Sequence, residues 1–334
     1  MTTRKILVFF LILMLTASPV LAGDVTLNRW VLNVTLHDDG LVEEVIQAEI
    51  DNGGSLPLGG FSFIVPASAV TMIYDFSHTQ SFTGMVVDQQ SVPGGVKVTV
   101  NFNSSIETGK NWDGRIGFTA QNWAVKEGSD YSIIIPVKAP QAIVAGKETE
   151  ISVPLDSEIR SQVFLPKGVT ATSVDVKSSA SKPYKKLLQF EYVVLTWFQL
   201  NNGDIVSIKG SFSEVLMKIV DNDAKYRELS TRIKNAKEQG LNVSDAQTHL
   251  NNAEDYNNNQ ALQSFWKGDT TVALQYAAYA NDELKLAENS LSSPEKTTLP
   301  AETAQGAQSQ KSPGFEIAGL ILILLISRTV QRKK

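Results

Sequence analysis

The chain has 334 residues, of which 43% are hydrophobic and 19% charged, with a formal net charge of −5 and no cysteine. Its length favours two or more domains, and its ordinary apolar content excludes wholesale disorder. The absence of cysteine excludes disulfides, thiolate metal sites and cysteine nucleophiles. The acidic balance argues against general nucleic-acid binding, so we expect no nucleic-acid partner.

The amino-terminal residues have the pattern of an export signal. Basic Arg4 and Lys5 precede ten apolar residues at 6–15, and a Val-Leu-Ala sequence ends at Ala22. Ten helical residues span only about 15 Å, half of a bilayer core, which favours a signal peptide over a membrane anchor. We expect the export machinery to recognise residues 1–22 and cleavage to follow Ala22.

The next part of the chain is predicted to be β-rich. Alternating apolar and polar side chains at 27–36 and 41–50 flank a His-Asp-Asp-Gly turn, which indicates a hairpin. Turn residues separate the further strands, and regularly spaced short strands favour a β-sandwich. These strands are expected at 61–65, 70–76, 82–87, 96–102, 115–120, 131–137, 148–153, 162–165, 170–176, 188–200 and 205–212.

Near Ser213 the hydrophobic period changes to three or four residues, which indicates helices. Ser213 is predicted to cap the first helix, a capping box at Ser244 to open the second, and Asp269 to cap the third. The asparagines at 257–259 are poor helix formers and are expected to bend or fray the second helix. Because short connections favour antiparallel neighbours, we predict a three-helix bundle or a helical hairpin.

The predicted fold class is therefore mainly β plus α, in a multidomain chain. Tandem β-sandwich-like modules precede an antiparallel helical bundle, a polar linker and a hydrophobic tail. The expected boundaries are 1–22 for the signal peptide, 23–140 for the β-sandwich-like domain, 141–212 for the second β module, 213–291 for the helices, 292–312 for a disordered linker and 313–334 for the tail.

The tail begins with Pro313, Gly314 and Phe315, continues with an apolar run at 317–326 and ends in basic residues. It resembles the PGF-CTERM sorting signal of archaeal surface proteins, and the resemblance covers only the residues from Pro313 onward. The resemblance implies that an archaeosortase removes the tail near this motif and that a membrane lipid is attached. Glu316 departs from the small residue common after Phe in that family. A retained carboxyl-terminal membrane helix is the alternative, and its basic end also places the body outside.

No catalytic constellation is found in the sequence. His37, His78 and His249 lack the spacing of a metalloenzyme, so we expect no metal and no cofactor. Glu43 and Glu44 are neighbours in a predicted strand and point to opposite faces, so they form no acid/base pair. Nucleophile elbows, Walker loops and dinucleotide fingerprints are absent. We expect a protein without enzymatic activity.

Two kinds of surface site are predicted. Trp112 and Trp123 stand among Asn, Asp and Gln, which is typical of aromatic rings that stack on sugars, with core packing as the alternative. Asn33, Asn103 and Asn242 begin glycosylation sequons, which are plausible on an exported chain.

The combined features predict a cell-surface protein anchored to the membrane at its carboxyl terminus, with its body outside. Its expected function is adhesion, envelope structure or ligand presentation, with an envelope glycan or another protein as partner. The alternative is an accessory or ligand-sensing subunit of a membrane transporter or signalling complex, which would use its helices to dock the partner.

Overall fold

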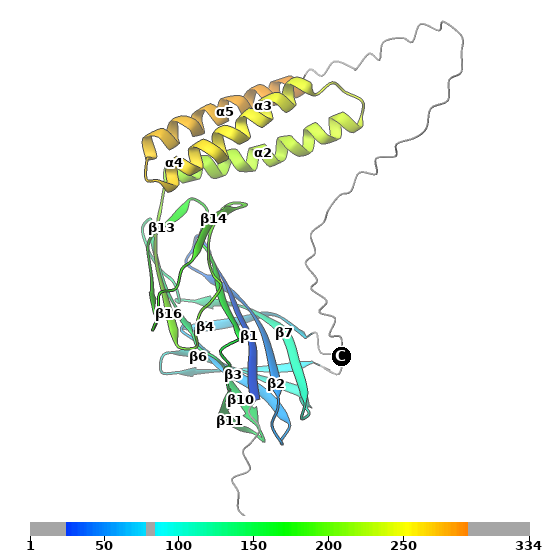
Figure 1. Cartoon of the computed structure of the whole chain (residues 1–334), viewed down its shortest axis with the longest axis vertical. Coiled ribbons are helices and arrows are strands. Elements are labelled where there is room, and N and C mark those ends of the chain that lie inside the picture. The colour runs from blue at the N-terminus through cyan, green and yellow to red at the C-terminus, as the bar shows by residue number, and fades with distance from the viewer. Residues whose placement is uncertain (1–24, 78–83, 293–334) are drawn as a thin grey trace, which may run out of the picture. The chain divides into compact units, whose positions relative to one another are not determined.

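The structure is a computed structural model that describes residues 25–77 and 84–292 (Figure 1). Strands dominate the described residues as far as Phe212 and helices those that follow, so the predicted mainly β plus α composition is confirmed. The predicted signal peptide, linker and tail lie outside these ranges. None of the helices in the described ranges has the length and apolar content that a membrane crossing requires.

The described strands form three sheets. The seven-stranded sheet has the order β14-β15-β12-β1-β2-β7-β4 and contains β1 (Val25–Leu36), β2 (Val42–Asn52), β4 (Ala69–Ser77), β7 (Lys110–Gln121), β12 (Glu158–Phe164), β14 (Lys185–Gln189) and β15 (Tyr192–Trp197). The five-stranded sheet has the order β11-β10-β3-β6-β5 and contains β3 (Leu58–Val65), β5 (Met85–Val92), β6 (Gly95–Ile106), β10 (Gln141–Val144) and β11 (Lys147–Glu150). The four-stranded sheet has the order β13-β16-β9-β8 and contains β8 (Val125–Glu127), β9 (Asp130–Val137), β13 (Val169–Lys177) and β16 (Asp204–Phe212).

Strands from both sides of residue 140 pair in all three sheets. β1 pairs with β12 in parallel, while β3 pairs with β10 and β9 with β16 in antiparallel register. The boundary expected between 23–140 and 141–212 therefore runs through each sheet and does not separate two sets of strands. The expected boundary falls directly before a strand, β10, which pairs with β3.

The predicted hairpin at the start of the body is confirmed. β1 and β2 pair from Leu36 with Val42 onward, and the backbone N–H of His37 donates to Leu41 O at 2.9 Å. Gly40 closes the turn with φ +85°, a conformation that a glycine adopts without steric cost. β2 alternates strictly between buried and half-buried side chains from Val42 to Asn52. One face of β2 therefore belongs to the core.

The single strand predicted at 188–200 is interrupted by a turn. It contains the end of β14 and all of β15, and these two strands form a tight hairpin that pairs Gln189 with Tyr192. Phe190 makes the turn with φ +55°, which is uncommon for a residue other than glycine. Because residues 185–197 contain no Gly, Pro, Asn, Asp or Ser, the usual turn residues, the hairpin was not predictable from composition.

A single apolar core joins the sheets. Aromatic rings connect the seven-stranded and five-stranded sheets: the ring centroids of Trp30 and Phe63 lie 5.9 Å apart, and those of Trp112 and Phe61 lie 5.0 Å apart. The same buried cluster includes side chains of β9, β16 and the first turns of the helical region. At about 25 cal/mol per Å² of buried apolar area, burial of this kind is the principal stabilising term for a chain without disulfides.

On the opposite face of the seven-stranded sheet, Arg29 connects four strands. Its guanidinium lies 2.9 Å from Glu49 on β2, 3.4 Å from Asp113 on β7 and 3.1 Å from Glu158 on β12. All four side chains are partly shielded from solvent, which makes the ion pairs stronger than isolated surface pairs. The arrangement links β12-β1-β2-β7 on the side away from the apolar core.

The helical region consists of α2 (Glu214–Glu238), α3 (Ser244–Glu254), the π-helical turn η1 (Asp255–Ala261), α4 (Leu262–Trp266) and α5 (Thr270–Ser292). As predicted, Ser213 caps α2 by accepting the Leu216 N–H, and Asp269 accepts the Val272 N–H at the start of α5. The predicted capping box at Ser244 is wrong, because Val243 holds the cap position and makes no side-chain hydrogen bond there.

Polar contacts in η1 connect three helical segments. Asn222 on α2 donates from Nδ2 to Asn257 Oδ1 at 3.2 Å and to Ala277 O on α5 at 2.8 Å. Asn257 donates in turn to Ile219 O at 3.0 Å. Both side chains are buried. The predicted irregularity at 257–259 is therefore confirmed as a π-helical turn, a feature often found where a helix deviates to place a specific group.

The close approach of β3 and β6 generates a stability prediction. A Cβ added at Gly60 would lie 2.0 Å from Val100 O, whereas one at neighbouring Gly59 would meet nothing nearer than Ile143 O at 3.5 Å. We expect Gly60→Ala to lower the free energy of unfolding by about 2 to 4 kcal/mol. Gly59→Ala, the matched control, should stay within about 1 kcal/mol of the native protein in urea unfolding. Equal effects of the two substitutions would contradict this packing.

Candidate ligand-binding cavity

A cavity of about 440 Å³ opens between strands of the seven-stranded and five-stranded sheets, close to the end of β9. Its size falls in the range of small-molecule sites. Most of its lining is apolar: Trp30, Leu32, Ile46, Phe63, Ile64, Val65, Pro66, Pro93, Gly94, Trp123, Pro136 and Ala139. The polar lining residues are Glu44, Ser62, Lys97, Lys138 and Gln141.

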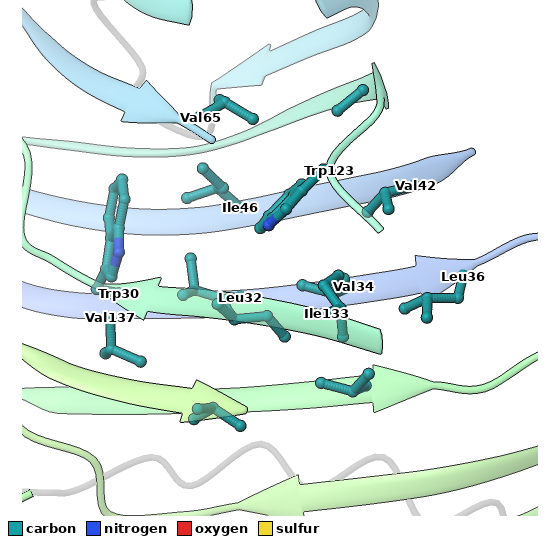
Figure 2. Packing of buried hydrophobic residues seen from close by; sticks show 14 of the residues in the cluster. Trp30, Leu32, Val34, Leu36, Val42, Ile46, Val65, Trp123, Ile133 and Val137 are labelled. Carbon is teal, nitrogen blue, oxygen red and sulfur yellow. The ribbon is translucent and has the colours of Figure 1, made fainter. Parts of the chain in front are cut away.

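Three aromatic side chains contribute to the walls. Trp30 projects from β1 and Phe63 from β3, and their rings meet edge to face. Trp123, in the loop between β7 and β8, donates its indole N–H to Ile134 O at 2.8 Å, which fixes the plane of the ring. Figure 2 shows Trp30, Trp123 and Ile46 with their side chains in the same buried layer. The aromatic surfaces are therefore held by packing and hydrogen bonding before any ligand enters.

Glu44 is the acidic side chain of the lining. It shares the core-facing side of β2 with Val42 and Ile46, and only 4% of its surface is exposed. Its register partners are Val34 on β1 and Phe118 on β7, neither of which can neutralise a carboxylate. Burial raises the pKa of Glu44 to about 8, so the carboxyl group is mostly protonated at neutral pH.

A polar group near the cavity is already satisfied. Ser62 donates from Oγ to Glu148 Oε1 at 2.6 Å, and the Lys97 ammonium forms an ion pair with the same carboxylate. The Lys97 and Ser62 hydrogen bonds lower the pKa of Glu148, so that carboxylate stays charged and balances Lys97. Lys138 is exposed at the cavity and forms no ion pair with another described residue.

A second, shallower hollow of about 360 Å³ adjoins the first. Pro66, Trp123 and Pro136 line both. Apart from Ser132, the rest of its lining is apolar and comes mainly from β9, including Ile134, which is 60% exposed. Trp123 therefore has the cavity on one side and an apolar surface on the other.

The two tryptophans predicted to stack on sugars are core residues. Trp112 is fully buried against Phe61 and Phe102, and Trp123 is 7% exposed. The expectation of exposed stacking surfaces is therefore wrong. Trp112 lies opposite Ile50 in the β2–β7 register, on the core-facing side of the sheet, so its polar sequence neighbours point the other way.

The sequons differ in accessibility. Asn103 on β6 and Asn242 before α3 are exposed. Asn33 is half-buried in the middle of β1, and its side-chain amide donates to Val45 O at 3.4 Å. Pro313, Gly314, Phe315 and the cleavage position after Ala22 lie outside the described residues.

The histidines do not form a shared site in the described chain. His37 lies 3.6 Å from Glu43, and His249 Nδ1 lies 2.7 Å from Glu283 on α5. His78 lies outside the described residues. Within 25–77 and 84–292, no group of three or more His, Asp or Glu side chains is placed to hold a metal ion.

Sequence reasoning placed Glu43 and Glu44 on opposite faces, as the structure does, but did not identify Glu44 as a site residue. The signal was an acidic residue at one position of an otherwise apolar alternating series, namely Val42, Glu44, Ile46, Ala48 and Ile50. A carboxylate at a core-facing position of a central strand is a marker of function, because it costs stability unless something compensates it.

No family model and no curated protein matches the chain. Among solved structures, a candidate protease of Parabacteroides distasonis is 12% identical over 80% of this chain and 59% of its own length, with a TM-score of 0.35. The M1 zinc metallopeptidase of Deinococcus radiodurans is 13% identical over 57% of this chain and 43% of its own length, with a TM-score of 0.34. Leukotriene A4 hydrolase of Saccharomyces cerevisiae is 10% identical over 57% of this chain and 30% of its own length, with a TM-score of 0.31. The chain thus spans less than two thirds of each neighbour, and such likenesses assign neither an activity nor a site to it.

The buried carboxyl group predicts a pH-dependent stability. The folded chain keeps the Glu44 proton up to about pH 8, whereas the unfolded chain releases it near 4.5. The folded state therefore binds the extra proton within this window, and the free energy of unfolding falls as the pH rises through it. Glu44→Gln removes the effect, so between pH 5 and pH 8 the native protein should lose roughly 3 kcal/mol more than the variant.

Urea unfolding of both proteins at the two pH values measures this difference. Glu150→Gln, at an exposed position on β11, is the control and should keep the pH dependence of the native chain. Parallel pH curves for Glu44→Gln and the native protein would contradict a neutral, buried Glu44.

Proposed function

We propose that this chain is an exported surface protein whose β body binds a small ligand in the cavity beside Glu44. The observation that carries the proposal is a largely apolar cavity with preformed aromatic walls and one buried, uncompensated carboxyl group. Cavities of this kind, with few polar groups among apolar ones, are typical of small-molecule sites. The proposed role is binding, because the one hydroxyl of the lining, that of Ser62, donates to a Glu148 carboxylate that Lys97 neutralises and holds charged, and such a carboxylate is a weak base for activating a nucleophile.

The proposed architecture places the β body outside the membrane, joined through the helical bundle and the 292–312 linker to the 313–334 tail. The support for export and anchoring is the sequence: a signal peptide ending at Ala22 and a tail that resembles the PGF-CTERM signal. An archaeosortase-like enzyme and a membrane lipid are the partners that this resemblance implies. A body held in this way meets ligands from outside the cell.

A cavity of this size fits a small molecule and not a polymer, which favours the accessory or ligand-sensing subunit over adhesion. Contacts between the β body and the helices support the same role. Phe265 belongs to the core of the β body, and the Lys186 ammonium lies 4.3 Å from the centre of the Trp266 ring. The helices would then present the liganded state of the body to a membrane complex.

Mass spectrometry of the mature protein tests the location. We expect a new amino terminus at Gly23, cleavage near Pro313 with an attached lipid, and glycans at exposed Asn103 and Asn242. Asn33 should be unmodified, because it lies within a central strand with its amide engaged. A chain that begins at Met1 would contradict export.

A blocked cavity tests the binding function. Ala139 lines the cavity outside the strands, so Ala139→Phe should place a ring in the opening. Ala180→Phe, at an exposed position that does not line the cavity, is the matched control. In a fragment screen by saturation-transfer NMR on the full chain, we expect bound fragments whose signals disappear with Ala139→Phe and remain with Ala180→Phe. A native chain without bound fragments, or fragments indifferent to Ala139→Phe, would contradict the proposal.

A further inference from the structure

The Glu44 carboxyl group has no protein counter-ion in the cavity. Neither a hydrogen bond nor an ion pair joins it to another described residue, and only 4% of its surface is exposed. Burial raises its pKa, and no neighbouring basic group opposes that rise. A buried carboxyl group in this position lowers stability, because it gives up its hydrogen bonds to water, and the loss is far larger for its charged form than for its neutral form.

The other charges at the cavity do not fill this role. Lys97 on β6 is paired with Glu148 on β11, which Ser62 also binds. Lys138, beyond the end of β9, is exposed to solvent. The strands on either side of Glu44 present Val34 and Phe118 beside it. Within residues 25–77 and 84–292, the chain therefore supplies no cation that complements Glu44.

The walls around Glu44 are suited to a cation. Trp30, Phe63 and Trp123 provide aromatic surface to the same cavity. The negative faces of aromatic rings attract ammonium groups, most strongly when the pair is shielded from water. An apolar molecule with a positively charged nitrogen matches both parts of this site: its nitrogen can pair with the Glu44 carboxylate, and its apolar body can pack against the aromatic rings.

We propose that the cavity binds an organic cation, an amine or quaternary ammonium on an apolar body, with Glu44 as its counter-ion. This inference rests on the proposed binding function and specifies its ligand. Because Glu44 is mostly protonated in the empty protein at neutral pH, a bound cation favours its ionised form, and binding releases the Glu44 proton to solvent.

Three probes of similar size and different charge test the inference: phenethylamine, phenethyl alcohol and hydrocinnamate. Calorimetry on the full chain at pH 7, in buffers of different ionisation enthalpy, measures affinity and proton release together. We expect the amine to bind at least tenfold more tightly than the alcohol and the anion, with close to one proton released. Its affinity should rise nearly tenfold per pH unit between pH 6 and pH 7.

Two variants separate the role of Glu44 from a general effect on folding. Glu44→Gln should weaken the amine at least tenfold, to the level of the alcohol, and abolish the proton release. Glu43→Gln, on the opposite face of β2, should leave both quantities unchanged. Circular dichroism and urea unfolding confirm that each variant is folded.

The outcomes distinguish this inference from the binding function beneath it. Equal affinities for the three probes, tighter binding of the alcohol or the anion, or an unchanged amine affinity in Glu44→Gln would overturn the cation assignment. In those cases Glu44 is not the counter-ion of a bound cation, and the cavity function stands if Ala139→Phe still abolishes binding. If neither the probes nor the fragments bind the native chain, the cavity function itself is overturned.

Discussion

The alternation of side chains along β2 governs both the core and the site. Successive residues of a strand point to opposite faces, so every second residue from Val42 to Asn52 must lie against the other sheets. Five of those six positions are filled by residues that core packing accommodates, four of them apolar and one the hydrogen-bonded Asn52. Glu44 occupies the remaining position and cannot turn outward, because a shift of register by one residue would bury the charged set of side chains.

The surrounding structure explains how the body tolerates this carboxyl group. β2 lies between β1 and β7, where strand pairing and aromatic packing hold it on both sides. On the outer face, Arg29 joins four adjacent strands through three carboxylates. The burial and strand pairing around β2 therefore offset the destabilising effect of the buried Glu44 carboxyl group. This is the pattern expected of a residue that is retained for its chemistry and not for stability.

Local signals in the sequence predicted most of the elements. Alternation identified the β1–β2 hairpin, and Ser213 and Asp269 marked the starts of helices. Such signals depend on a few neighbouring residues, so they can be read before any tertiary contact is known. Phe190 shows the opposite case, because a left-handed turn at a phenylalanine is imposed by the strands it joins.

The site could not be predicted in the same way. Alternation states which residues share a face, but not which face is covered by another sheet. The Asn and Asp beside Trp112 suggest a surface residue that stacks on sugars, with core packing as the alternative, and its pairing with Ile50 places it in the core. The cavity depends on β1, β2, β3, β6 and the end of β9, whose proximity follows from the pairing of the sheets and from no single segment.

The buried asparagines of the helices have a mechanical consequence. If α2 slid along its neighbours by one turn, Asn222 and Asn257 would lose hydrogen bonds to three segments and leave their amides unsatisfied in an apolar interior. These hydrogen bonds therefore oppose slippage between the helices and hold α2, η1 and α5 in one register.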